Sequence, residues 1–390
     1  MTNVDIVISG GGVIGTALAL ACERLQYRTL LLDEPLVRHT TGRFGFDLRT
    51  VALSPQSLAW LDDLLSCEQL PRQRVERMHI WEHLGTSTID FCSEEVGSDS
   101  LAWILEHSTV ATAVRNKCEK LLGNIETETI TAVDETPKSI TLTNGKVVFC
   151  KLLVIAEGAN SRTRELVGAR WDSQSLGQRA IVTVIETEQP HNNTAWQRFG
   201  NGVLAFLPLT KPNTHAIVWS VPNPLFSALQ SIDDDQFKER LNRESDQVCG
   251  KVLEVDQRVS FPLNHGLANT FRPRPWIFIL GDSAHTIHPL AGQGMNLGIE
   301  DVRSLESILR TSNIDQAFSP IQLQALAQRR RAKAIIMQQL MSLFDNTWRW
   351  KDPLSHWLRN FGVRTFSRLS AIKKQVIREA MGFGPITKVN

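Results

Sequence analysis

The sequence has no excess of one charge. Its 42 Lys and Arg residues are matched by 41 Asp and Glu residues, which leaves a formal net charge of +1. Such a chain carries no overall field that would attract nucleic acid or an acidic partner. We therefore expect no nucleic-acid partner, and any basic surface must be local.

The sequence also lacks paired cysteines and long apolar runs. Its six cysteines include no C-x-x-C pair, which argues against a zinc ribbon or a redox dithiol. No apolar run approaches the roughly 18 to 20 residues needed to span a bilayer. The apolar start carries Asp5 and has no basic residue before Arg24, so we expect a folded element there and not a signal peptide. These features predict a cytoplasmic protein, with any membrane contact peripheral and on the inner face of the membrane.

The first 33 residues carry a dinucleotide-binding pattern. A β-rich run at 4–9 leads into Gly10-x-Gly12-x-x-Gly15, a helix-forming stretch and a second strand at 28–32. The glycines allow a tight turn, close approach of backbone to a pyrophosphate, and close packing of helix on strand. The helix start offers free N–H groups to the anion. Asp33 ends the second strand, where it can accept hydrogen bonds from a ribose diol.

Two later segments have a similar strand-to-turn character. Residues 153–164 run from an apolar strand into a polar turn that contains Glu157 and Gly158. Residues 277–301 run from a strand into Gly281-Asp282-Ser283-Ala284-His285 and then through a glycine-rich stretch into a helical pattern. Between them, strand-rich sequence over about 176–264 predicts a second domain inserted into the first.

On these segments, and on Arg49 with the Val-Ala-Leu-Ser that follows it, residues 105–108 and residues 205–209, the chain resembles the class A flavoprotein monooxygenases of the para-hydroxybenzoate hydroxylase fold. Within that group it is similar to the ubiquinone-biosynthesis hydroxylases. The resemblance covers nearly the whole chain, and residues 281–298 are its most specific part. It implies FAD as cofactor, NAD(P)H as reductant, and hydroxylation of a polyprenyl phenol by O2 through a flavin C4a-hydroperoxide.

The resemblance and the strand pattern together predict an α/β fold. We expect a Rossmann-like FAD-binding domain of the glutathione-reductase type, an inserted β-sheet substrate domain and C-terminal helices. The expected divisions are 1–75, 100–175 and 265–345 for the FAD-binding domain, 76–99 and 176–264 for the substrate domain, and 346–390 for the C-terminal helical segment.

The third segment supplies most of the expected flavin contacts. An Asp at a strand end, as Asp282 would be, can accept hydrogen bonds from the ribityl hydroxyls. A helix that begins near Gly294 would aim its positive end at the flavin N1 and O2, where charge collects on reduction. The predicted cofactor-binding residues are Gly10, Gly12, Gly15, Asp33, Glu34, Arg49, Glu157, Gly158, Asp282, Pro289, Gly292, Gln293, Gly294, Met295 and Asn296.

The resemblance also implies residues near the reaction. Pro289 would lie beside the flavin ring, and Phe206 would line the substrate side of the flavin with Leu207 and Pro208, with Trp219 on the same sheet. His285 and His288 are hypothesised to act in phenol deprotonation or proton relay. The predicted catalytic residues are His288, Pro289 and Phe206.

One residue departs from the family pattern. The family usually has Asp-Gly in the second segment, where this chain has Glu157-Gly158. The extra methylene moves the carboxylate by about a bond length, which matters in a site preorganised to about 0.5 Å. This departure favours one alternative function, a non-catalytic FAD-binding subunit of a biosynthetic complex. A different flavin oxidoreductase on the same fold is a second alternative.

Two other patterns imitate metal sites. Residues 79–83 match H-x-x-E-H, but their surroundings alternate like a strand and not like the helix that motif needs. Asp282, His285 and His288 are spaced like ligands, yet Asp282 has a flavin role and Pro289 breaks a continuous helix. We predict no metal. The basic stretch from Arg349 to Arg378 is either a solvated helical face or a peripheral membrane or complex surface.

Overall fold

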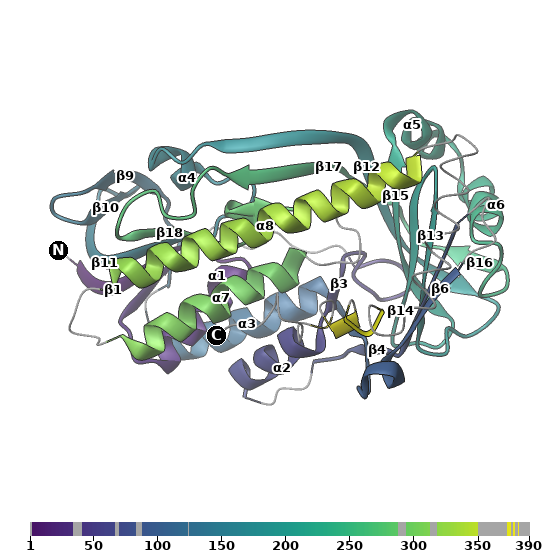
Figure 1. The fold of residues 1–390 in the computed structure, drawn as a ribbon, viewed down its shortest axis with the longest axis horizontal. Coiled ribbons are helices and arrows are strands. Elements are labelled where there is room, and N and C mark those ends of the chain that lie inside the picture. Colours follow the sequence, from purple (N-terminus) through teal and green to yellow (C-terminus); the bar gives the residue numbers. More distant parts are fainter. Residues whose placement is uncertain are drawn as a thin grey trace.

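The computed structural model describes residues 2–33, 41–66, 70–82, 88–123, 125–287, 294–312, 318–349, 373–375, 377, 378 and 381. One end of the molecule is built on a seven-stranded sheet (Figure 1). Its strands, in spatial order, are β8 (Ile125–Glu126), β2 (Thr29–Leu32), β1 (Thr2–Ser9), β11 (Val147–Ile155), β10 (Ser139–Leu142) and β9 (Ile130–Asp134), with β18 (Ile277–Ile279) beside β11.

The core of this sheet is parallel. β1 runs parallel to β2 and β11, and β18 runs parallel to the last residues of β11. The carboxyl ends of these strands therefore meet at one edge, where ligands of such sheets bind. The sheet shares one apolar core with the helices α1 (Val13–Arg24), α2 (Pro55–Leu64), α3 (His107–Leu121), α7 (Gly294–Thr311) and α8 (Pro320–Arg349).

A nine-stranded sheet forms the other end. Its spatial order is β19 (His285–Thr286), β17 (Val259–Ala268), β12 (Trp171–Thr187), β15 (Thr214–Pro222), β14 (Gly202–Pro208), β13 (Thr194–Gly200), β5 (Arg77–Glu82) and β6 (Thr88–Cys92), with β16 (Val252–Val255) beside β12. A small sheet lies between the two ends and contains β3 (Thr50–Leu53), β7 (Ala102–Glu106) and β4 (Gln73–Val75). Short helices complete the described chain: η1 (Ser93–Val96), α4 (Arg162–Leu166), α5 (Asn223–Ser231), α6 (Asp234–Glu244) and η2 (Gly281–Ser283).

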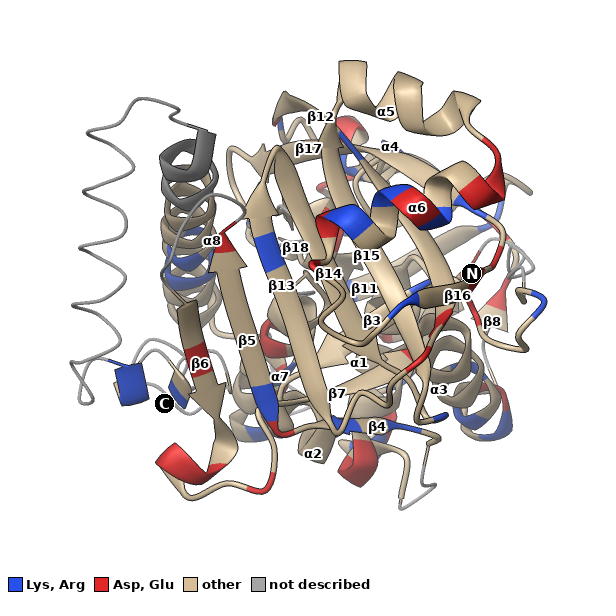
Figure 2. Cartoon of the chain, turned by 90° about the vertical axis from the view of Figure 1, so that its right-hand side faces the viewer, with Lys and Arg blue, Asp and Glu red and all other residues tan. Residues whose placement is uncertain are grey.

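The nine-stranded sheet has two different faces. Its outer face is covered by α5 and α6, which lie in front of the strands in Figure 2. Its inner face packs against the small sheet, through a cluster that includes Val184 and Ala216 of the large sheet and Val75 and Ile104 of the small one. Any cavity between the two ends of the molecule can therefore meet only the inner face.

The structure confirms the predicted α/β fold and the β1–α1–β2 start. The strand candidates in the sequence include 140–149 as a single strand and none over 171–179, and the structure differs at both places. Residues 140–149 form two strands, because Gly145 turns the chain with a φ of +79°. The polar residues 171–179, which none of these candidates covers, form the first half of β12 and pair with β17. His79 lies on a strand as predicted, with its Nδ1 2.6 Å from the Asp90 carboxylate.

Candidate functional site

A cavity of about 1250 Å³ lies at the carboxyl edge of the parallel strands. Ligand pockets are usually about 300–1,000 Å³, so it is large enough for a dinucleotide. The cavity is lined by all three segments that the sequence singled out, including Gly12, Gly158 and Asp282. Their predicted convergence is confirmed.

Two glycines of the first turn have no room for a side chain. A Cβ on Gly10, whose φ is +112°, would lie 2.4 Å from the Ala156 carbonyl oxygen. A Cβ on Gly15 would lie 1.9 Å from the Gly10 carbonyl oxygen. Gly12 precedes α1 as its N-cap and has no atom within 4 Å of a built Cβ. The turn therefore presents bare backbone and a helix start to the cavity, which suits a pyrophosphate.

Asp33 lies at the end of the cavity nearest β2. Its side chain covers the first turn, because a Cβ on Gly11 would meet the carboxylate at 2.0 Å. Arg115 of α3 forms an ion pair with Asp33, and Arg115 also bonds to Glu119 at 2.6 Å. Arg115 thus fixes the direction of the carboxylate that was predicted to hold a ribose.

Glu157 is bonded on both carboxylate oxygens. It accepts hydrogen bonds from the Ser9 hydroxyl, from the Ser161 hydroxyl at 2.7 Å, and from the Thr163 N–H at 3.0 Å and hydroxyl. Ser9 immediately precedes the first glycine turn, whereas Ser161 and Thr163 belong to the second segment. The longer side chain of Glu157 therefore connects the two segments.

Arg164 joins the second segment to the third. Its buried guanidinium donates to the carbonyl oxygens of Ser283, at 3.1 Å, and Ala159, at 2.9 Å. It also stacks over the Trp171 ring with 4.1 Å to the centroid, and burial lowers its pKa. The Ser283 hydroxyl in turn donates to the Gly158 carbonyl at 3.1 Å.

Asp282 presents its carboxylate to the cavity. The side chain is exposed on the cavity side, although protein surrounds it elsewhere. This burial raises the pKa of Asp282, and nearby His285 and Arg49 partly offset the effect. Arg49 also lines the cavity, as predicted. An acidic and a basic side chain therefore line the same cavity.

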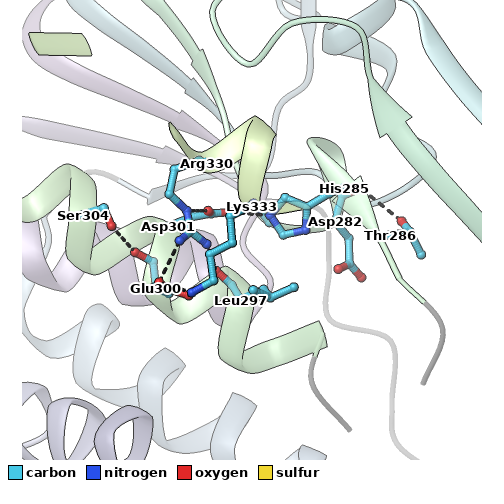
Figure 3. Close-up of polar contacts among 10 residues, drawn as sticks. Asp282, His285, Thr286, Leu297, Glu300, Asp301, Ser304, Arg330 and Lys333 are labelled. Carbon is cyan, nitrogen blue, oxygen red and sulfur yellow. Dashed lines mark hydrogen bonds and ion pairs between the residues drawn. The ribbon is translucent and has the colours of Figure 1, made fainter. Parts of the chain in front are cut away.

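A buried ionic network lies behind the turn that carries Asp282 (Figure 3). Asp301 accepts hydrogen bonds from the Gly281 N–H at 2.9 Å, from His285 Nε2 at 2.7 Å and from Arg330 Nε at 2.5 Å. Burial by itself would raise the pKa of Asp301, but Arg330, His285 and the Gly281 N–H hold it well below its usual range. Asp301 is therefore an anion at neutral pH.

His285 belongs to this network and not to the cavity. It is 2% exposed, and its ring lies 5.7 Å from that of Phe271. In Figure 3 the carboxylate of Asp282 is turned away from the network, whereas His285 points to Asp301. His285 therefore does not contact the cavity directly, and its role in proton relay stays a hypothesis.

The start of α7 forms part of the cavity wall. The described part of the helix starts at Gly294, which lines the cavity with Met295. Ile14 of the first segment packs against two glycines of the third, since a Cβ on Gly298 would meet it at 2.8 Å and one on Gly281 at 3.3 Å. Close packing at these glycines brings α7 to the first turn.

Asn296 was predicted to bind the cofactor, but its side chain is used elsewhere. The amide oxygen accepts from the Ser54 N–H at 2.8 Å, and the amide nitrogen donates to the Ala52 carbonyl at 2.8 Å. With both ends bonded to backbone, the side chain tethers α7 to the small sheet. The predicted residues Glu34, His288, Pro289, Gly292 and Gln293 lie outside the described residues.

Phe206 is also placed differently from its prediction. It is 1% exposed and belongs to the outer-face core, together with Trp219 and with Phe237 of α6. Side chains alternate along a strand, so the neighbouring Leu207 points to the inner face, where it packs on the small-sheet cluster. The prediction that Phe206 lines the substrate side is therefore wrong by one residue in register.

Some residues at the site carried no role in the sequence argument. Buried Asp47 accepts from the N–H groups of Arg49 and Ser108, each at 2.9 Å, and so joins the Arg49 loop to the start of α3. His107, the first residue of α3, lines the cavity. For His107, the only signal in the sequence was the run 105–108, which is part of the family resemblance. No signal marked Asp47.

Neither a metal cluster nor a membrane-spanning helix is found in the part of the chain that the structure describes. No three His, Cys, Asp or Glu side chains there are grouped as metal ligands. None of the described helices is both long enough and apolar enough to cross a membrane.

Known proteins match this chain along nearly all of its length. A family model described as "FAD binding domain" matches residues 93–339. The 3-demethoxyubiquinol 3-hydroxylase of Escherichia coli K12 is 28% identical, covering 98% of this chain and 100% of that protein. The ubiquinone biosynthesis monooxygenase COQ6 of Danio rerio is 26% identical over 96% of this chain and 88% of its own length. Among solved structures, the p-nitrophenol 4-monooxygenase PnpA of Pseudomonas putida has a TM-score of 0.77 at 18% identity, covering 99% of this chain and 100% of that one.

Proposed function

Because this chain belongs to the FAD binding domain family, we propose that it is an FAD-dependent monooxygenase that hydroxylates the aromatic ring of a polyprenyl phenol in ubiquinone biosynthesis. The observation that carries the proposal is the single cavity shared by the three flavin-type segments. The two ubiquinone-pathway relatives match the chain from end to end, which supports the choice of reaction and substrate class.

The residues around the cavity fit FAD. The first glycine turn would hold the pyrophosphate, Asp33 the adenosine ribose, and Asp282 the ribityl chain. Arg49 would supply positive charge beside the cofactor, and the start of α7 at Gly294 would face the flavin edge that gains charge on reduction. When bound, FAD would pass electrons from NAD(P)H to O2, and one oxygen atom of the O2 would enter the ring.

This chain's own task is then to orient the substrate and exclude water. A phenol would lie between the flavin and the inner face of the nine-stranded sheet, with Leu207 on its wall. An apolar wall protects an activated oxygen species from water. Residues 76–99 and 176–264 would form the substrate domain. Residues 1–75, 100–175 and 265–345 would form the FAD-binding domain.

The polyprenyl tail would bring the protein to a membrane surface. Most of the basic stretch 349–378 lies outside the described residues. Within the described part, Lys373 forms an ion pair with Glu95 at 2.5 Å, and Ile377 is 3% exposed, so this end of the stretch packs on the protein. The peripheral contact, on the cytoplasmic side, would use the other basic residues.

The proposal is tested with purified protein, reductant and labelled oxygen. The protein should be yellow with a flavin spectrum, and one atom of 18O2 should appear in the ring of a demethoxy- or deoxy-quinol precursor. An Asp282→Ala variant should bind FAD at least about tenfold more weakly, since it loses charge-assisted hydrogen bonds. Protein that takes up no FAD, or product whose new oxygen comes from water, would contradict the proposal.

A further inference from the structure

Building on the proposed function, we propose that the C-terminal helix α8 is a positioning element for the flavin: Arg330 and Gln338 hold the two ends of the turn that presents Asp282. Neither residue lines the cavity, so both act through the turn and not by touching the cofactor. They lie eight residues apart on α8 and therefore point to the same side of the helix.

Arg330 holds the beginning of the turn through Asp301. Its guanidinium donates to Asp301 and, at 3.1 Å, to the Leu297 carbonyl, and it pairs with Glu300 at 2.9 Å. Asp301 then receives the N–H of Gly281, whose φ of +60° places it in the left-handed region. Without the cation, the carboxylate would be a buried, partly unpaired charge, and its bond to the turn would weaken.

Gln338 holds the end of the turn. Its amide nitrogen donates to the Thr286 carbonyl at 3.0 Å and to the Gly266 carbonyl at 2.8 Å. Gly266 and Thr286 are themselves paired between β17 and β19. One amide thus fixes both the exit of the turn and the strand that carries it into the nine-stranded sheet.

α8 also contacts the part of that sheet that would face substrate. Met341, one turn beyond Gln338, packs against the inner-face cluster of Ile80, Ile89, Phe199 and Val203. The helix therefore spans from the buried network at the flavin turn to the inner face of the sheet, as its long diagonal course in Figure 1 shows. Its position sets the distance between Asp282 and that face.

The test compares Arg330→Gln with Arg329→Gln, which makes the same change at the next residue, on the exposed side of the same helix. Arg330→Gln should raise the FAD dissociation constant at least about tenfold and alter the visible circular dichroism of the bound flavin at saturating FAD. Arg330→Lys, which retains the charge, should recover most of the affinity. Arg329→Gln should match wild type in both measurements.

Gln338→Leu provides a second test that removes no charge, in case Arg330→Gln does not fold. It should weaken FAD binding about threefold and change the same circular dichroism signal, because the turn loses its fixed exit. The inference is overturned if the folded Arg330 and Gln338 variants bind FAD with wild-type affinity and an unchanged flavin signal. That result would leave hydroxylation by the wild-type protein intact, whereas a wild-type chain that binds FAD without hydroxylating would contradict the proposed function alone.

Discussion

Two buried titratable residues, one at each end of the molecule, are kept in opposite charge states. Beside the cavity, buried Asp301 is matched by Arg330 and remains charged, with its pKa held well below the usual range. On the outer face of the nine-stranded sheet, buried His215 lies among the rings of His191, Trp196 and Phe206, and burial lowers its pKa to about 3. Buried Asp301 therefore stays charged because Arg330 pairs with it, whereas buried His215 stays neutral because aromatic rings surround it.

This difference has consequences for each end. The cavity end depends on complementary partners, so removing one partner should cost more than the lost volume suggests. The outer-face core around Phe206 and His215 depends on filled volume and on an uncharged His215, so truncation and acid should affect it most. Variants at the two ends test this contrast.

The largest effect is expected for Asp301→Asn. This change leaves Arg330 with a neutral partner in a buried site, and we expect the free energy of unfolding to fall by about 3–5 kcal/mol at pH 7. Because the pKa of Asp301 is lowered on folding, its contribution is present above the unfolded value of about 3.9 and is lost as the pH falls through the folded value. Denaturant unfolding at pH 7 measures the first effect, and a series from pH 4 down to pH 2 measures the second.

The matched control for that change is Asp235→Asn. Asp235 is 89% exposed and pairs with Lys238 on the surface of α6, so its variant should unfold like wild type. Equal stability of the Asp301 and Asp235 variants would mean that the buried network contributes no more than a surface pair.

The next effect is expected for Phe206→Ala at the other end. Truncating a fully buried aromatic in the outer-face core should lower the free energy of unfolding by about 3 kcal/mol. FAD affinity and the substrate KM should stay at wild-type values, because the ring points away from the cavity. Leu207→Ala, its neighbour on the inner face, should instead raise the substrate KM. If the Phe206 variant had normal stability and a raised substrate KM, Phe206 would contact the substrate, as the resemblance implied.

Phe206 and Leu207 also show how much of the site the sequence can predict. Motif spacing placed the turns correctly, since glycines that tolerate no Cβ, such as Gly10 and Gly15, leave few alternative backbones. Which face a strand residue occupies depends on register with its neighbours, and a one-residue slip exchanges the faces. The family resemblance therefore located the strand around Phe206, but it did not show which face of the sheet the Phe206 side chain occupies.

Other parts of the site needed contacts between distant residues. Arg330 meets Asp301 across 29 positions, and Ser9 meets Glu157 across 148. No local pattern marks either pair, because an Arg on a helix or a Ser at a strand end is common in any fold. The polar first half of β12 was missed for a related reason, since its strand structure depends on pairing with β17 and not on its own alternation.

A smaller effect, visible only with pH, is expected at His215. A histidine that stays neutral on folding takes up a proton only in the unfolded chain below about pH 6.5, so wild-type stability should fall on acidification toward its folded pKa of about 3. Between pH 7 and pH 5 this amounts to about 2 kcal/mol. His215→Leu should remove most of that slope in denaturant unfolding, although burial also lowers the pKa of His191 and will keep some of it.

The control for the pH slope is Ile217→Val, a small change on the same face of the same sheet that alters no titratable group. It should retain the wild-type loss of stability between pH 7 and pH 5. An unchanged slope in the His215 variant would show that the outer face does not exclude charge, and the contrast between the two ends would then fail at this point.

The smallest effect is expected for Glu157→Asp, which installs the residue usual in the family. Shortening the side chain withdraws the carboxylate from Ser9 while its bonds to Ser161 and Thr163 can persist, because those donors lie on the same segment. We expect FAD affinity to fall about fivefold, or about 1 kcal/mol, since one charge-assisted bond between the first and second segments is lost. Fluorescence titration of FAD measures it.

A double-mutant cycle decides whether that loss comes from the bond between segments. If Glu157 acts through Ser9, then Ser9→Ala should weaken FAD binding by a similar factor, and combining it with Glu157→Asp should add little, because both changes remove the same contact. Additive losses would instead mean that the shorter carboxylate disturbs the pyrophosphate side of the cavity directly. If the two losses are not additive, the longer side chain of Glu157 is accommodated through its bond to the Ser9 hydroxyl on β1. The cavity end would then depend on paired polar groups at this position too.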